Sequence, residues 1–516
     1  MLELAAVHPD RVAVADVGEE LTYAALVRWV YLLRADLLAA GCAPGDRIAV
    51  LLRRGLSAPV VFLAAESIGA AYVPLDRDWP PRRLADVLRR SAPRCLVTSP
   101  QDAPLDQQAD TDSAPTVLMV PQPTGNGTDL PTGDDLQRTL LRRPDPEEAR
   151  YLIHTSGSTG RPKAVAVSHR GMLNHLSAMV TVLSMGPQDI VAFTAPPSYV
   201  ISIWQMLAPL LVGGRVAVVN DMDVQFPRRL ARRFADAEVT VMELVPSVIK
   251  ALTTEVGRHP ESAPYSALRH LISTGAPLPT ALAAEAIAAF PGVELLNAYG
   301  CTECSDDVTL HQVTQADLAA PQIPAGRPLP GVTLYVLVAE DGRWRPAAPG
   351  ESGELWVGGT GVSPGYPDEP ELTRSAFFRD PFDPNSPTGR LYRTGDLALF
   401  RGGRLHCLGR ADRQVKVAAI RVELDEVESA VNNLPGVAGC AVVVDQEQGR
   451  ARLRAYVVTP GKVTDRELHK AARGVLPLGL VPHSWVRVDA LPLTGSGKVD
   501  YRRLSLSFAS EPTVQL

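Results

Sequence analysis

Cysteine is scarce in this chain, which has six in 516 residues. Six are too few for the disulfide framework that small secreted domains use, and a chain of this length can bury a large core without one. Cys301 and Cys304 form one C-x-x-C pair. A structural zinc site usually needs a second pair or spaced histidines, and the sequence has neither. We interpret the pair as two small residues in a loop.

Long apolar runs are also missing. The longest extends from Val60 to Leu75, is interrupted by Glu66 and is shorter than the roughly 20 residues that cross a bilayer. The N-terminus, MLELAAVHPDRV, has no basic region followed by an apolar stretch and does not resemble a secretory signal. These absences predict no membrane partner and a cytoplasmic location.

The chain also lacks a large excess of either positive or negative charge. The net charge is −6, which gives no electrostatic footprint for nucleic acid, so we expect no nucleic-acid partner. Lysine is rare: six of the 51 basic residues are lysines, and three of these fall inside the motifs described below. Because a lysine supplies a compact point charge that arginine does not, each one invites a functional reason.

Short apolar runs alternate with helical patterns from residue 12 to 98 and again from 151 to about 300. The segment 23–40 is typical of a helix, with Thr22 as its N-cap and Gly41 just past its end. This alternation predicts an α/β fold with mainly parallel sheets covered by helices. Residues 100–148 break the pattern and are rich in Pro, Asp, Gln, Thr and Gly, so we interpret them as a long surface connection.

The second half of the chain changes character. Short β-like runs between Gly and Pro turns over residues 322–408 predict a small antiparallel sheet or barrel. The last hundred residues return to mixed α and β, with one helical pattern and two strands that we expect to pair. A boundary near residue 411 predicts a large domain over 1–411 and a small α+β domain over 412–516.

The strongest local motif is YLIHTSGSTGRPK, residues 151–163. An apolar strand leads into a loop of glycines and hydroxyl residues, whose backbone N–H groups can converge on an anion. Lys163 adds a positive charge. It is not the usual P-loop, because Pro162 disfavours a helix at this point. The alternative is a polar turn between strands, but the loop suits a polyphosphate.

This loop resembles the one that binds ATP phosphates in the acyl-adenylate-forming superfamily, which includes nonribosomal peptide synthetase adenylation domains, acyl-CoA synthetases and luciferases. Seven further matches follow in the family's order, so that the resemblance covers almost the whole chain. They are LTYAAL (21–26), GAAYVPLD (69–76), NAYGCTE (297–303), GELWVGG (353–359), YRTGDL (392–397), GRADRQVKVAAIRVELDEVE (409–428) and LTGSGKVD (493–500). The AYVPLD block and the QVK run are most similar to adenylation domains of peptide synthetases, which implies a ligase of secondary-metabolite biosynthesis.

The resemblance implies a two-subdomain doubly wound core with a small β-barrel, a mobile C-terminal lid, and ATP and Mg²⁺ as cofactors. It also implies roles for single residues. The residues implied to hold ATP are Thr155, Ser156, Gly157, Ser158, Thr159, Gly160, Lys163, Asn297, Tyr299, Gly300, Thr302, Asp396 and Arg410. Tyr299 would stack on adenine, Asp396 would accept hydrogen bonds from the ribose, and Glu303 would bind Mg²⁺, for which a carboxylate oxygen is suited.

Adenylate formation joins two anions, a carboxylate and the α-phosphate of ATP, and pyrophosphate leaves. The nucleophile is already ionised, so positioning and electrostatic stabilisation should dominate over general-base catalysis. By resemblance Lys498 bridges the carboxylate and the phosphoryl oxygens, Asp412 is the hinge of the lid, and residues 417–421 serve a second half-reaction. A lid that closes over the site also excludes water from a reactive anhydride.

The acid-binding pocket departs from the family's pattern. Members that activate α-amino acids carry an Asp where this chain has Val200, and a buried ammonium without a carboxylate is costly. Yet the implied pocket contains three acids, which cannot all stay buried and charged without a cation. The pocket residues implied by the resemblance are Tyr199, Val200, Ile201, Trp204, Glu243, Ile272, Thr274, Gly275, Ala298, Asp306 and Asp307.

We therefore expect a substrate whose positive charge lies away from the α-carbon: a β-amino, ω-amino, diamino or guanidino acid. An aryl or hydroxy acid is the alternative, and the register over 304–307 stays open by one residue. Ala419 stands where the family usually has Gly beside the incoming thiol.

For the acceptor we expect a separate carrier-protein phosphopantetheine thiol, since no carrier segment follows Lys498. A free amine, giving an amide, or coenzyme A is the alternative. A kinase or ATPase that used residues 155–163 would release ADP instead. A non-catalytic binding protein would need a lost motif residue, and Lys163, Glu303, Asp396 and Lys498 are all present.

Overall fold

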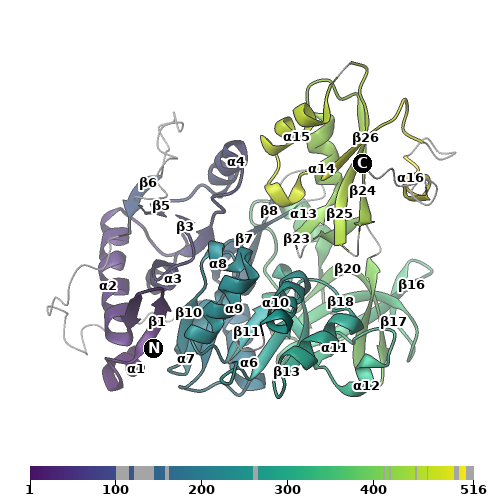
Figure 1. The fold of residues 1–516 in the computed structure, drawn as a ribbon. Coiled ribbons are helices and arrows are strands. Elements are labelled where there is room, and N and C mark those ends of the chain that lie inside the picture. The colour runs from purple at the N-terminus through teal and green to yellow at the C-terminus, as the bar shows by residue number, and fades with distance from the viewer. Residues whose placement is uncertain are drawn as a thin grey trace. The chain divides into compact units, whose positions relative to one another are not determined.

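The computed structural model describes residues 1–99, 115–120, 144–156, 162–259, 265–410, 413–417, 420–447, 450–461, 463–492 and 499–506. Contacts between residues divide the chain into two compact units (Figure 1). The first comprises residues 1–77, 88–154 and 164–411. The second comprises residues 78–87, 155–163 and 412–516. Each unit is described by itself.

A nine-stranded sheet dominates the first unit. Its strands run in the order β15 (Arg327–Pro328), β14 (Asp306–Gln312), β13 (Glu294–Cys301), β12 (His270–Ser273), β11 (Val241–Leu244), β9 (Ile190–Phe193), β10 (Arg215–Val218), β1 (Val12–Asp16) and β2 (Glu19–Thr22). The strands from β13 to β1 are parallel, and antiparallel strands flank them at both edges. This arrangement confirms the predicted α/β class.

A second sheet in the order β6 (Thr116–Met119), β5 (Cys95–Thr98), β3 (Arg47–Leu51), β4 (Ala71–Pro74), β7 (Ala149–Thr155) and β8 (Lys163–Ser168) completes the α/β architecture. Its strands from β6 to β7 are parallel. Strand β6 lies inside the segment that the sequence predicts to be a surface connection, so part of that prediction is wrong. Four residues, TVLM, suffice for an edge strand because only one neighbour must be paired.

Helices cover the nine-stranded sheet on both faces. Buried side chains of α2 (Tyr23–Ala39), α3 (Ser57–Ile68), α6 (His169–Val182) and α7 (Ile201–Leu211) form one core with residues of both sheets. The other face packs against α9 (Pro227–Asp236), α10 (Pro246–Arg258) and α11 (Thr280–Ala289) (Figure 1).

Helix α2 begins and ends as its sequence predicts. The Thr22 hydroxyl accepts a hydrogen bond from the Ala25 N–H at 3.2 Å, as an N-cap does. Gly41 has φ of +80°, and this left-handed conformation just past the helix is one that glycine adopts without strain. The six buried side chains between Tyr23 and Leu37 recur at helical spacing.

A six-stranded antiparallel sheet follows in the first unit, as the Gly/Pro-punctuated pattern predicts. It has the order β17 (Arg343–Pro346), β16 (Val332–Glu340), β18 (Gly353–Gly359), β20 (Arg390–Arg401) and β19 (Phe377–Arg379), and β21 (Arg404–Arg410) also pairs with β20. The pairing of β20 with β21 places Asp396 opposite Arg410.

The second unit combines α and β elements around its own core. Strands β24 (Gly439–Glu447) and β25 (Arg450–Val458) form the predicted antiparallel pair, and β26 (Ser484–Arg487) joins β25 in parallel. Helices α14 (Leu424–Asn432) and α15 (Asp465–Arg473) pack their apolar side chains on these strands. The α+β character predicted for the last hundred residues is confirmed.

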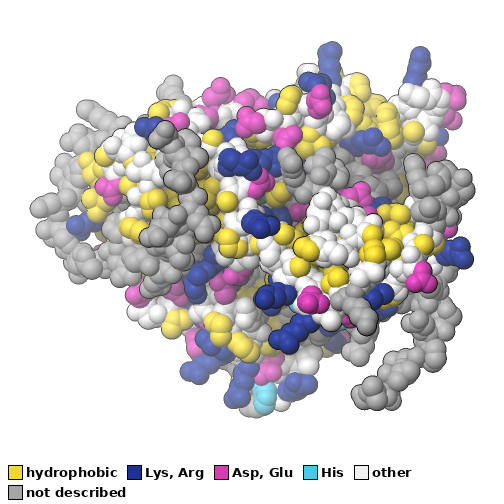
Figure 2. Space-filling model, turned by 90° about the horizontal axis from the view of Figure 1, so that it is seen from above, with side chains coloured by type: hydrophobic (Ala, Val, Ile, Leu, Met, Phe, Trp, Pro, Cys, Tyr) yellow, Lys and Arg dark blue, Asp and Glu magenta, His cyan; other side chains and the backbone are white. Residues whose placement is uncertain are grey.

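On the face drawn in Figure 2, Lys and Arg side chains are interspersed with Asp and Glu. In the part of the chain that the structure describes, no helix has the length and apolar content needed to cross a membrane.

Candidate active site

Three acidic side chains predicted to line the acid pocket lie close together in the first unit. Glu243 comes from β11, and Asp306 and Asp307 begin β14. Strands β11, β12, β13 and β14 are successive neighbours in the nine-stranded sheet, which is why residues more than 60 positions apart in sequence meet. All three are buried, and Glu243 is only 1% exposed. In the pairing of β13 with β14, Asp306 lies opposite Cys301 and Asp307 opposite Gly300. Which of residues 304–307 match the family's pocket positions stays a prediction.

Neutral donors hold two of the three carboxyl groups. The Trp204 indole N–H donates to Glu243 Oε2 at 2.5 Å, and the Thr274 hydroxyl donates to Asp307 Oδ1 at 3.2 Å. The carboxyl groups of Glu243 and Asp307 also lie within hydrogen-bonding range of each other. Because two carboxylates cannot donate, this contact requires a proton on one of them.

The environment favours the protonated form of these acids. Burial raises the pKa of Glu243 well above its usual value, and the negative charges of Asp307 and Asp306 raise it further. Burial also raises the pKa of Asp306 well above its usual value, with smaller contributions from Asp307 and Cys301. Both shifts favour the protonated, uncharged form of these carboxyl groups when no cation is present.

His175, which the sequence does not single out, completes the cluster. Its Nε2 lies 3.5 Å from Asp306 Oδ2, and its ring also hydrogen-bonds the backbone of Asp307. Burial lowers the pKa of His175 to about 4, so the imidazole is neutral at pH 7 and brings no positive charge to the acids. In sequence it is a single histidine on the buried face of α6, where a core role is the usual expectation.

Asp306 has a backbone conformation that non-glycine residues rarely adopt. Its φ is +111°, and the preceding Ser305 has φ of +68°. A β-bulge between Tyr299 and Gly300 shifts the pairing of β13 with β14 at this point. Such strain costs about 1–3 kcal/mol and tends to occur at functional sites.

The remaining predicted pocket residues are mainly apolar. Val200 is the N-cap of α7, and Ile201 begins this helix. Both are partly buried against the main core, together with fully buried Ile272 and buried Ala298. Tyr199 is half-buried, and Gly275 has φ of +79° just after Thr274. The described residues 199–204 at the start of α7 include no Asp or Glu.

The residues predicted to bind adenine and ribose form a second group. The Tyr299 hydroxyl donates to Asp396 Oδ2 at 2.5 Å, and Arg410 Nη1 donates to Asp396 Oδ1 at 3.0 Å. Burial, then the charge of Asp396, raises the pKa of Tyr299 well above its usual value, so it remains a hydrogen-bond donor. Asn297 Nδ2 donates to the Pro324 carbonyl at 2.8 Å. Their roles toward ATP stay a prediction.

The backbone of β14 packs so closely against Gly300 that no side chain fits at this position. A Cβ there would lie 2.3 Å from the Asp306 carbonyl oxygen and 2.4 Å from Asp307 Cα. Real Cβ atoms do not approach backbone atoms so closely. Gly300 therefore allows β13 and β14 to pair closely and holds the acids of β14 beside β13.

Thr302 and Glu303 follow β13 in a short 3₁₀ turn (Thr302–Cys304). Glu303 is fully buried, and the Tyr366 hydroxyl donates to its Oε1 at 2.9 Å. The Ser363 N–H donates to the Glu303 carbonyl at 2.9 Å. Both the backbone and the side chain of Glu303 are thus held by the loop at 360–366, which sequence reasoning does not connect with it.

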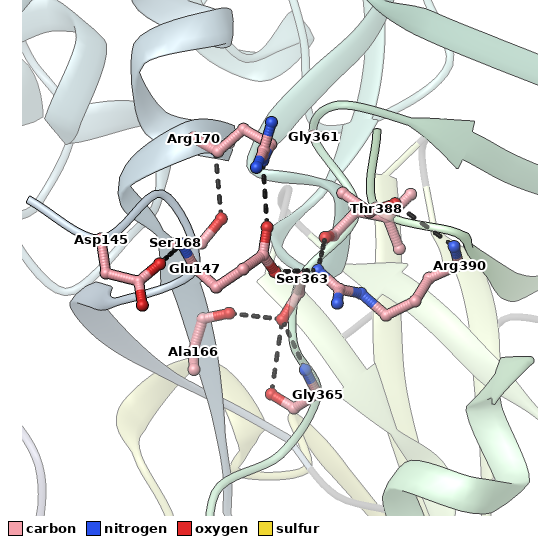
Figure 3. Close-up of polar contacts among 12 residues, drawn as sticks. Asp145, Glu147, Ala166, Ser168, Arg170, Gly361, Ser363, Gly365, Thr388 and Arg390 are labelled. Carbon is pink, nitrogen blue, oxygen red and sulfur yellow. Dashed lines mark hydrogen bonds and ion pairs between the residues drawn. The ribbon is translucent and has the colours of Figure 1, made fainter. Parts of the chain in front are cut away.

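That loop is itself anchored by the network drawn in Figure 3. Ser363 Oγ donates to the Ala166 carbonyl on β8 and accepts from the Gly365 N–H at 3.1 Å. Figure 3 also shows Glu147 between two arginines: Arg170 Nε donates to its Oε1 at 3.0 Å and Arg390 Nη2 to its Oε2 at 2.7 Å. Burial raises the pKa of Glu147, but these two arginines outweigh it and lower the pKa.

The phosphate-loop residues that the structure describes belong to the second unit. Thr155 ends β7, Lys163 begins β8 and is buried, and the Ser156 hydroxyl donates to the Arg421 carbonyl at 2.8 Å. The other predicted residues lie outside the described residues. They are Gly157, Ser158, Thr159, Gly160, Asp412, Ala419 and Lys498.

The described residues suit one mode of Mg²⁺ binding, in which a carboxylate acts together with the nucleotide. In the described part of the chain no group of three or more His, Cys, Asp or Glu could hold a metal ion. Mg²⁺ is commonly bound by one or two carboxylates together with substrate phosphates. The oriented carboxylate of Glu303 suits that mode, in which the nucleotide supplies most of the ligands.

Comparisons with known proteins agree with these features. Residues 2–367 match the family described as AMP-binding enzyme, and residues 426–498 match the AMP-binding enzyme C-terminal domain. The phosphinothricin tripeptide synthetase PhsB of Streptomyces viridochromogenes is 37% identical over 518 residues, which are 98% of this chain and 41% of that protein. This chain therefore spans about two fifths of that relative.

Two other relatives are matched over nearly their whole length. An L-proline–L-prolyl-carrier protein ligase of Streptomyces coelicolor is 34% identical over 97% of this chain and 94% of its own. Among solved structures, the amide bond synthetase McbA from Marinactinospora thermotolerans has a TM-score of 0.83 and 27% identity, covering 96% of this chain and 97% of that one.

Proposed function

Because the chain belongs to the family of AMP-binding enzymes, we propose that it activates a small non-standard amino acid as its acyl-adenylate and transfers the acyl group to a carrier-protein thiol. Adenylate formation, with ATP as the nucleotide, is the activity of this family. The substrate and the acceptor are the parts that we propose.

The observation that carries the substrate proposal is the location of the acidic side chains in the pocket. Apolar Val200 stands at the start of α7, while the buried acids Glu243, Asp306 and Asp307 cluster at β11 and β14. A substrate ammonium would therefore find no carboxylate at the first position and three at the second. This distribution supports a β-amino, ω-amino, diamino or guanidino acid rather than an ordinary α-amino acid.

In the proposed reaction the chain positions two anions and offsets their charge. The ribose would replace Tyr299 as a donor to Asp396, and Glu303 would hold Mg²⁺ against the phosphates. Lys163 and Lys498 would neutralise the phosphates and the attacking carboxylate. The Mg²⁺ ion, when bound, offsets charge on the leaving pyrophosphate. Residues 412–516 would act as the lid.

Three acceptors are candidates, and the comparisons described above bear on two of them. Similarity to a prolyl-carrier protein ligase over nearly the full length of both chains supports a carrier thiol. Similarity to an amide bond synthetase supports a free amine as the alternative acceptor, and coenzyme A is a third candidate in this family. Incubation of the acyl-adenylate with each acceptor, followed by mass spectrometry of the product, distinguishes them.

ATP–pyrophosphate exchange tests the activation step. The panel contains α-, β- and ω-amino acids, diamino, guanidino, hydroxy and aryl acids of similar length. We expect Mg²⁺-dependent exchange with an acid whose cation is not on the α-carbon. Exchange with α-amino or aryl acids alone would contradict the substrate class but keep adenylation. Release of ADP without exchange would contradict the reaction.

A further inference from the structure

The acid cluster contains oxygen atoms that lack a hydrogen-bond donor. Apart from the carboxyl group of Asp307, no described residue donates to Glu243 Oε1, and none donates to Asp306 Oδ2. Both side chains are more than nine-tenths buried, so water does not readily replace a missing donor. Buried polar atoms of this kind are costly, and the large majority are paired in native proteins.

The described neighbours of the cluster do not include a counterion for these oxygens. Glu243 faces Asp307, Asp306 and the Trp204 indole. Asp306 faces Asp307, Cys301, Tyr151 and the imidazole of His175. His175 Nε2 also lacks a partner among the described residues, and this ring is neutral. Within the described part of the chain, only protons or a ligand remain to offset the charge of these oxygens.

The existing hydrogen bonds indicate which kind of cation the remaining acceptor oxygens can bind. Trp204 occupies Glu243 Oε2, and Thr274 occupies Asp307 Oδ1. Glu243 Oε1 is therefore the oxygen of that side chain to which neither an indole nor a hydroxyl donates, and the other acceptors come from a different strand. A guanidinium prefers both oxygens of one carboxylate in one plane. A primary ammonium has three donors that diverge toward separate acceptors.

We propose that Glu243, Asp306 and Asp307 form the binding site for a primary ammonium group of the substrate, which takes the place of the proton shared between Glu243 and Asp307. This inference rests on the proposed function, since it assigns the ammonium to the acid being activated. It narrows the substrate to an acid with a non-α primary amine and excludes guanidino, hydroxy and aryl acids.

The strained backbone of Asp306 supports the same assignment independently. Glycine adopts φ of +111° freely, whereas aspartate does so at a cost. A purely structural position would be better served by glycine. The side chain of Asp306 is therefore expected to serve binding rather than stability.

Replacement of a proton by an ammonium makes substrate binding pH-dependent. The proton shared between Glu243 and Asp307 in the empty site must leave when the ammonium binds. The substrate amine stays charged below pH of about 10. The kcat/KM of the wild type for the amino acid should therefore rise with pH more steeply than the kcat/KM for a neutral acid, because one proton is released when the ammonium binds.

The first experiment compares acids of matched length in ATP–pyrophosphate exchange. The probes are α-alanine, β-alanine, 4-aminobutyrate, 3-guanidinopropionate and 3-hydroxypropionate. We expect kcat/KM for one non-α amino acid to exceed that of the guanidino and hydroxy acids at least tenfold. Preference for the guanidino, hydroxy or α-amino acid would overturn the ammonium site while leaving adenylation intact. Absence of exchange with every acid, including the wider panel above, would instead contradict the proposed function.

Variants separate binding from folding. Glu243→Gln keeps the size of the side chain and should lower kcat/KM for the amino acid at least tenfold, flatten its pH profile and spare the hydroxy acid. Asp306→Gly should lose the same preference yet unfold at an equal or higher temperature. The control is Glu354→Gln, another buried carboxylate, which is paired with Arg393. An unchanged amino-acid preference and pH profile in Glu243→Gln, or a destabilised Asp306→Gly with its preference intact, would overturn the inference.

Discussion

Asp396 accepts hydrogen bonds from two side chains, those of Tyr299 and Arg410. If its carboxylate binds the ribose hydroxyls, Asp396→Asn removes the charge from these bonds. Hydrogen bonds to charged groups contribute about 1.5–3 kcal/mol, so we expect the KM for ATP to rise about 10- to 100-fold with a smaller change in the KM for the acid. Steady-state exchange at varied ATP measures this. An increase confined to the acid's KM would contradict the ribose role.

Tyr366 offers a second test at the scale of one residue. Tyr366→Phe removes the hydroxyl that donates to Glu303 Oε1 and should lower unfolding free energy by about 1–3 kcal/mol. If Glu303 binds Mg²⁺, a less constrained carboxylate should also require more Mg²⁺ for half-maximal exchange. A Mg²⁺ titration of both proteins checks this. A stability loss with an identical Mg²⁺ curve would show that Tyr366 supports the fold alone.

Sequence reasoning reached some of these residues and missed others for a physical reason. Tyr299, Asp396 and Arg410 lie within motifs, and the structure brings them together. His175 and Tyr366 act through contacts with residues more than 60 positions away. A single polar residue on a buried face leaves no periodic pattern, so its partner cannot be predicted from one sequence.

At the scale of elements, the pairing of β13 with β14 depends on Gly300. Gly300→Ala places a Cβ against the backbone of β14, where no side chain can move away. Overpacking of this kind costs about 1–3 kcal/mol or more. We expect a lower melting temperature and loss of exchange because the acids of β14 are displaced.

The matched control is Gly257→Ala in α10, where a Cβ meets open space. Alanine is a better helix former than glycine by about 0.8–1.0 kcal/mol, so this variant should be slightly more stable and fully active. Normal exchange in Gly300→Ala would contradict the role assigned to the bulge.

The ion pairs of Glu147 connect three elements: α6 through Arg170, β20 through Arg390, and the segment before β7. The lowered pKa of Glu147 means that its stabilising effect is present above the unfolded pKa of about 4.3. It is lost as the pH falls through the folded value. Glu147→Gln should therefore lower the melting temperature slightly at pH 7, and the difference should be smaller near pH 3.

The effect should be below about 1 kcal/mol because the Glu147 side chain is 40% exposed. Thermal unfolding at both pH values, with exposed Glu19→Gln as the control, measures it. A difference in melting temperature that grows toward pH 3 would contradict stabilisation by the ionised Glu147.

At the scale of the molecule, the fold class follows from sequence because burial imposes local periodicity. Alternating apolar runs predict parallel strands and covering helices, and both sheets of the first unit have them. A linear boundary near residue 411 does not anticipate that residues 78–87 and 155–163 belong to the second unit. Contacts between distant segments leave no local pattern. Strand β6 escapes prediction because polar, Pro-rich and Gly-rich sequence surrounds it on both sides.

Lys498, which the resemblance assigns to the adenylation step, gives the prediction at this scale. Lys498→Ala should slow ATP–pyrophosphate exchange about 10²- to 10³-fold, the usual cost of removing one group that stabilises developing charge. Lys470→Ala in α15 is the control and should exchange normally. If Lys498 serves adenylation only, transfer from synthetic acyl-adenylate to the acceptor should persist in Lys498→Ala. Equal loss of both steps would contradict a role confined to the first.

The unusual backbone angle of Asp306 has an evolutionary consequence. Codons for aspartate and glycine differ by one base, and glycine would relax the turn at this position. A mutation toward the more stable protein is therefore always one step away, and only selection for the substrate would remove it. If that selection ceased, mutation and drift should replace Asp306 by glycine. The enzyme would then be more stable and its pocket less selective, and activation of neutral acids could evolve from it.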